Sequence, residues 1–114
     1  MEETNLKQKE ETTNDSTTPK VSVLMSVYNS MLYLEQSVQS ILDQTFRDFE
    51  FIIINDGSTD GTQKILETFV DPRIRIVMQP NTGLTKALNR GLKLCRGEFI
   101  ARMDADDISM PERL

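Results

Sequence analysis

The chain has 114 residues, of which 38% are hydrophobic, and a net charge of −5 at pH 7. No apolar run is long enough to cross a bilayer, and a negative chain is unsuited to a nucleic-acid backbone, so one globular domain without a nucleic-acid partner is expected. The absence of histidine and the single cysteine, Cys95, exclude Ser-His-Asp and Cys-His catalysis and zinc sites built on those residues. Any metal would need oxygen ligands, which favours Mg²⁺, Mn²⁺ or Ca²⁺.

Residues 1–19 are polar and charged, and Leu6 is their only large apolar residue after Met1. Such a segment buries too little apolar surface to offset its ordering entropy, so we predict a disordered tail. The residues after Met1 include no apolar stretch of the kind found in signal peptides, so no signal peptide is predicted there. A cytoplasmic location is therefore expected, with peripheral attachment to the inner membrane face left open.

Residues 20–114 alternate short apolar runs with amphipathic segments, which is typical of repeated βα units. Residues 21–27 (VSVLMSV) predict a strand, and the polar Tyr28-Asn29-Ser30 follows, where a helix can be capped. The next helix is predicted from an apolar stripe: Leu34, Val38, Ile41, Leu42 and Thr45. Residues 51–54 predict a strand buried on both faces, and residues 62–69 predict a second helix.

The remaining elements repeat this order. Residues 73–76 alternate polar with apolar side chains and predict an edge strand. Residues 84–95 predict a helix, after which Gly97 is expected to form a left-handed C-cap. Residues 98–103 predict a last strand, and Ser109, Pro111 and Glu112 predict that a further helix begins there. The expected fold is α/β, a Rossmann-like parallel sheet of about four strands with flanking helices, in a domain interrupted before its natural end.

Polar side chains follow three of the predicted strands, where ligands bind in parallel sheets. Tyr28, Asp56 and residues 104–107 should therefore meet at one rim. Asp104-Ala105-Asp106 is a DxD triplet, and such carboxylates can hold a cation against a diphosphate. Without the cation the charges repel, since two unit charges about 4 Å apart interact by roughly 4 kcal/mol at an effective dielectric near 20. The alternative interpretation is a solvated loop that caps the following helix.

Other candidates also have two interpretations. Asp56 could accept a hydrogen bond from a base or ribose, or serve as an ordinary turn residue. Tyr28 could stack on a nucleobase or cover the top of the sheet. Lys86 and Arg90 could bind phosphate or belong to a solvated helix face. Arg102 is similarly ambiguous, whereas Cys95 falls on an apolar stripe and is expected to be buried.

The order and spacing of several motifs between Pro19 and Leu114 closely resemble the family 2 glycosyltransferases. The motifs are residues 23–29 (VLMSVYN), 40–45 (SILDQT), 55–62 (NDGSTDGT), 81–84 (NTGL), 89–91 (NRG) and 97–107 (GEFIARMDADD). The resemblance implies the glycosyltransferase A-type fold and transfer of a sugar, with inversion, from a nucleoside diphosphate. It also implies a UDP-linked donor, a Mn²⁺ or Mg²⁺ cofactor, and an acceptor glycan or lipid-linked sugar in bacterial polysaccharide biosynthesis.

The resemblance also assigns roles to residues. Ser26 and Tyr28 would line the base pocket, and Asp56 would contact the base. Asp104 would contact the ribose or the water shell of the metal, and Asp106 would be the direct metal ligand. The neighbouring Asp107 would assist Asp106. Lys86 is a weaker phosphate candidate, because many relatives have their basic residue at the position of Leu88.

Two departures limit what the 114-residue chain is expected to do. Many relatives have proline at the position of Ser26, and the family's general base lies well beyond the DxD. We therefore predict weak donor binding without transferase activity, and self-association through a sheet edge left uncovered.

Three other classes are possible alternatives from the residues alone. A sugar nucleotidyltransferase should have a glycine-rich basic loop after the first strand, which Tyr28-Asn29-Ser30 does not supply. A phospho-accepting receiver domain should have an acidic pair there, which is also missing. A non-catalytic nucleotide-binding module stays open.

Overall fold

A parallel sheet organises the chain. The computed structural model describes residues 18–114, so the predicted tail at 1–19 lies almost wholly outside the described residues. The strands are β1 (Val21–Val27), β2 (Phe49–Asp56), β3 (Ile74–Gln79) and β4 (Phe99–Arg102), and the helices are α1 (Met31–Leu42), α2 (Thr62–Glu67) and α3 (Leu84–Leu94). The sheet has four strands in the order β3-β2-β1-β4, and each neighbouring pair is parallel. The α/β fold expected from the sequence is confirmed.

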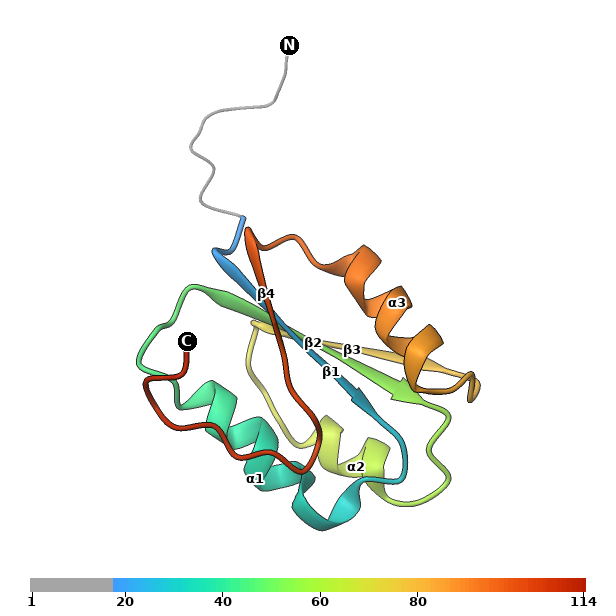
Figure 1. The fold of residues 1–114 in the computed structure, drawn as a ribbon. Helices are drawn as coiled ribbons and strands as arrows, with labels where there is room; N and C mark the ends of the chain where they lie inside the picture. Colours follow the sequence, from blue (N-terminus) through green and yellow to red (C-terminus); the bar gives the residue numbers. More distant parts are fainter. Residues whose placement is uncertain (1–17) are drawn as a thin grey trace.

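Helices cover both faces of the sheet: α1 and α2 lie on one side and α3 on the other (Figure 1). Successive side chains of a strand point to opposite faces, so β1 and β2 contribute to two clusters. The larger cluster packs Met25, Phe51 and Ile53 with α1 and α2, and the smaller one packs Leu24 and Ile52 with α3. Every residue of β2 is buried, as its continuous apolar run predicted.

The two edges of the sheet are β3 and β4. The prediction of an edge strand near residues 73–76 is confirmed, and β3 continues to Gln79 because it pairs with β2 as far as Asp56. At the other edge, Phe99 and Ile100 of β4 are 57% and 48% exposed. None of the described helices has the length and apolarity needed to cross a membrane.

One local prediction is wrong. Gly97 is not among the glycines with positive φ; α3 ends at Leu94, and its C-cap residue Cys95 is in an extended conformation. The reason for a glycine at 97 is close packing, because a Cβ there would lie 2.4 Å from the backbone nitrogen of Ser22. Residues 104–114 run along α1 with turns at 105–106 and 111–112, and the helix expected to begin at Ser109, Pro111 and Glu112 stays a prediction. There the Ser109 amide donates to Ser40 Oγ at 3.0 Å, and the Pro111 carbonyl accepts from the Thr45 amide at 2.9 Å.

Candidate functional site

A cleft lies at the carboxyl rim of the sheet, between the ends of β1 and β4. Its volume is about 280 Å³, and its lining residues are Ser26, Asn29, Ser30, Leu32, Tyr33, Asp104, Ala105 and Asp106. The two segments meet because β1 pairs with β4 in register from Val21 with Phe99 to Leu24 with Arg102. Continuing that register brings Ser26 level with Asp104.

The acidic segment after β4 forms a compact cluster. Carboxylate oxygens of Asp104, Asp106 and Asp107 lie within 4.8 Å of one another, and all three residues are exposed. The turn is closed by the Asp107 amide, which donates to the Asp104 carbonyl at 3.0 Å, and by the Asp104 amide, which donates to Asp107 Oδ2 at 3.2 Å. Arg102 forms an ion pair with Asp104 at 3.3 Å. Three close oxygen ligands at the mouth of a cleft suit a hard divalent cation that also binds phosphate oxygens.

The loop after β1 is fastened to the loop after β2. Asn29 has a φ of 48°, a left-handed conformation that asparagine tolerates well. Its Oδ1 accepts from the Thr59 amide at 2.8 Å, and its amide donates to Ser58 Oγ at 2.9 Å. Tyr28, beside it, is 51% exposed and does not line the cleft. The fixed backbone therefore presents an aromatic ring at the rim, available to a flat ligand.

Asp56, at the end of β2, is only 2% exposed and is held by the loop between β3 and α3. Its Oδ1 accepts from Gln79 Nε2 at 2.8 Å and from the Thr82 amide at 2.9 Å, and its Oδ2 accepts from the Gly83 amide at 2.9 Å. Burial raises the pKa of Asp56, but the hydrogen bonds from Gln79, Thr82 and Gly83 outweigh it and lower the pKa below its ordinary value. The carboxylate is therefore ionised, and its oxygens are already used to order this loop.

Sequence reasoning did not find the partners of Asp56. Gln79 ends β3 directly opposite Asp56 in the strand register, and Arg90 donates to Gln79 Oε1 at 2.8 Å. The signal was the polar Gln79 at the end of an apolar strand, followed by Asn81-Thr82-Gly83. Pairing Gln79 with Asp56 would have required the register between β2 and β3, which the sequence alone does not give.

The predicted site residues thus fall into two groups. Ser26, Asp104 and Asp106 line one cleft, with Tyr28 on the adjoining loop. Asp56 lies under the β3–α3 loop and outside the cleft lining, and Lys86 is exposed on the first turn of α3, also outside the lining. All of them lie toward the carboxyl ends of parallel strands.

Comparison with known sequences gives these positions a common context. The sequence profile described as glycosyl transferase family 2 matches residues 22–114. The chain belongs to this family. It is 46% identical over 96 residues to an uncharacterised glycosyltransferase of Haemophilus influenzae, covering 82% of this chain and 30% of that protein. It is 39% identical over 108 residues to a chondroitin synthase of Escherichia coli, covering 93% of this chain and 16% of that protein.

Solved structures of this family 2 domain's relatives share its fold. TarS 1–349 of S. aureus in complex with UDP has a TM-score of 0.77 and 33% identity, over 82% of this chain and 29% of that chain. A mannosyltransferase of Pyrobaculum calidifontis in complex with GDP-Man and Mn²⁺ has a TM-score of 0.68 and 28% identity, over 80% of this chain and 28% of that chain. The present chain therefore spans less than a third of the length of each of these relatives.

Proposed function

We propose that residues 20–114 form the donor-binding part of an inverting glycosyltransferase and bind a nucleoside diphosphate sugar, UDP-linked, through a divalent cation. The observation that carries this proposal is the shared cleft, in which Ser26 at the end of β1 faces the carboxylates of Asp104 and Asp106 after β4. The complexes of TarS with UDP and of the mannosyltransferase with GDP-Man and Mn²⁺ support the ligand class.

Each side chain has a role in this proposal. Asp106 holds Mn²⁺ or Mg²⁺ directly, and Asp104 binds its water shell or the ribose. Ser26 and Tyr28 receive the base, and Lys86 offers a cation to the phosphates. Asp56 contributes to the base pocket through the Thr82-Gly83 backbone that its carboxylate orders. The cation would neutralise the diphosphate against the acidic cluster, while these residues fix the orientation of the donor.

Calorimetric titration with UDP and GDP, with and without Mn²⁺, tests this proposal. UDP is expected to bind only with Mn²⁺, and Asp106→Asn should weaken binding by about tenfold or more, because it removes one charged ligand. Glu112→Gln is the matched control, since Glu112 is an exposed carboxylate outside the cluster, and it should leave the affinity unchanged within about twofold. Binding that needs no metal and ignores Asp106→Asn would remove the proposed role of the acidic cluster.

We also propose an acceptor and a setting for the whole protein. The acceptor is a glycan or lipid-linked sugar in the cytoplasm or at the inner membrane face, in keeping with the chondroitin synthase of Escherichia coli among the relatives. The 114-residue chain alone is expected to show no acceptor-dependent release of UDP. A coupled assay that detected such turnover would contradict this expectation.

Finally, we propose that two copies of the chain associate through the outer edge of β4.

A further inference from the structure

A second pocket lies at the opposite end of the sheet from the acidic cluster. Its volume is about 510 Å³, and it is lined at the amino ends of β2 and β3 by four arginines, Arg47, Arg73, Arg75 and Arg96. We call it the arginine pocket. Because β1 and β2 have seven and eight residues, this pocket is separated from the carboxyl rim by roughly 20 Å at 3.3 Å per residue.

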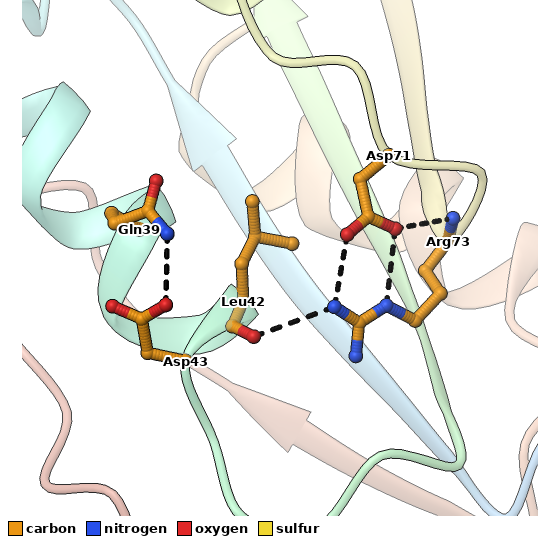
Figure 2. A network of polar contacts seen from close by, with 5 residues as sticks. All are labelled: Gln39, Leu42, Asp43, Asp71 and Arg73. Atoms are coloured by element: carbon orange, nitrogen blue, oxygen red, sulfur yellow. Dashed lines mark hydrogen bonds and ion pairs between the residues drawn. The ribbon is translucent and has the colours of Figure 1, made fainter.

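Arg73 is rigidly held within the pocket. Its Nε and Nη2 donate to the two oxygens of Asp71 at 3.0 and 2.9 Å, and Nη2 also donates to the Leu42 carbonyl at 3.4 Å (Figure 2). The guanidinium stacks over the Phe49 ring at 4.3 Å from its centroid. Its third nitrogen, Nη1, is buried and has no hydrogen-bond partner among the described residues. A buried charged donor without a partner is costly, so an acceptor oxygen that reached this group after a local shift of its neighbours would be stabilising.

Arg47 and Arg75 add two cations whose guanidinium groups are not paired with other described side chains. Both are exposed, and neither forms an ion pair or a side-chain hydrogen bond within residues 18–114. The Arg47 charge is nevertheless close to Asp71: hydrogen bonds from Arg73 chiefly lower the pKa of Asp71, and the charges of Arg73 and Arg47 lower it further. The four arginines line this one pocket together.

The carboxylates in this region are mostly occupied by partners. Asp71 is paired with Arg73, and Glu50 accepts from the Arg96 amide at 2.6 Å and from Arg96 Nε at 3.1 Å. Asp48 is the other acidic lining residue. Four arginines against these three carboxylates leave a local excess of positive charge, although the whole chain has a net charge of −5. Such a concave cationic site attracts an anion despite the overall charge.

We infer that the arginine pocket binds a phosphate group. Guanidinium forks match phosphate oxygens in geometry and form short charge-assisted hydrogen bonds with them. Arg73 and Arg96 are positioned beforehand by their carboxylate partners, so they lose little freedom on binding, and Arg47 and Arg75, against Asp48 alone, supply the excess positive charge. The group can belong to a soluble phosphate compound or to a phospholipid headgroup, and this inference is independent of the donor site.

Titration of the 114-residue chain with inorganic pyrophosphate, followed by amide NMR shifts in EDTA, tests the inference. Without metal the acidic cluster should be silent, and saturable shifts are expected at Arg47, Arg73, Arg75 and Arg96. The double variant Arg47→Gln/Arg75→Gln should bind about tenfold more weakly or worse. Lys64→Gln/Lys93→Gln is the matched control, because it removes two exposed cations from α2 and α3, and it should change affinity by less than about twofold.

Circular dichroism melting is the check that both double variants fold. If they do, weaker binding can be attributed to the lost guanidinium groups. Absence of saturable shifts at the arginines, or equal weakening in the control variant, would overturn the inference. Co-sedimentation with phosphatidylcholine vesicles, with and without phosphatidic acid, separates the two sources. Arginine-dependent binding to the acidic vesicles assigns a headgroup, whereas pyrophosphate binding without vesicle binding assigns a soluble phosphate.

Discussion

The Asp56 carboxylate connects the centre of the sheet to the loop before α3. It accepts hydrogen bonds from Gln79, Thr82 and Gly83 while almost fully buried. Asp56→Asn keeps the shape but replaces one acceptor oxygen with an N–H donor that faces other donors. We expect the free energy of unfolding to fall by about 1–3 kcal/mol, measured by urea denaturation at pH 7. Asp43→Asn is the control, because Asp43 is exposed and, within residues 18–114, its carboxylate accepts only from Gln39 (Figure 2).

The same carboxylate predicts a pH dependence. The pKa of Asp56 is lowered in the folded state, so the unfolded chain binds the proton more readily. Its contribution is fully present above the unfolded pKa, ordinarily 3.8, and is lost as the pH falls through the still lower folded pKa. The stability difference between the wild-type chain and Asp56→Asn should therefore be largest near neutral pH and shrink below about pH 4. A difference that grew in acid would show that Asp56 is not ionised in the fold.

Gly97 shows how one residue fixes the approach between two elements. A Cβ at this position would lie 2.4 Å from the Ser22 nitrogen and 2.6 Å from the Val21 carbonyl carbon, which are backbone atoms of β1. The Gly97 amide also donates to Ser22 Oγ at 2.7 Å. Gly97→Ala should push β4 away from β1 and destabilise the chain by about 1–3 kcal/mol, measured as a loss of unfolding free energy in urea. Asn89→Ala, at an exposed position of α3, should have little effect, and equal stability of the two variants would contradict the packing argument.

Local patterns predicted the elements better than their junctions. The bounds of β1 and the burial of β2 were readable because apolar and β-branched residues are continuous there. The left-handed C-cap expected at Gly97 does not form, because this glycine packs against the backbone of β1. In the candidate site, the shared rim followed from the parallel sheet, whose strands end on the same side, and the place of Ser26 there followed from the family resemblance. The burial of Asp56 did not follow, because it depends on the register of β2 with β3 and on the path of the loop beyond it.

At the scale of the whole molecule, the proposed pairing of two copies through the outer edge of β4 would have one favoured register. Phe99 donates its amide to Lys20 and Met103 donates to Leu24, so the backbone groups of Ile100, lying between them in alternation, point away from β1. An antiparallel pair centred on Ile100 would place Glu98 of each copy opposite Arg102 of the other. Opposite charges in such cross-strand pairs are favourable. The Arg102 carbonyl already accepts from Arg113 at 2.8 Å, and its second lone pair remains for the partner strand.

A charge-swap series tests this register. Glu98→Arg or Arg102→Glu alone would place like charges opposite each other and should weaken the dimer by about twofold to fivefold, whereas the combined variant should restore it. Sedimentation velocity across a concentration series measures the dissociation constant, and circular dichroism checks the fold of each variant. Because the exposed Phe99 and Ile100 are unchanged throughout, nonspecific apolar association would not respond to the swap. A monomeric wild-type chain at high concentration, or a combined variant as weak as the single ones, would contradict pairing in this register.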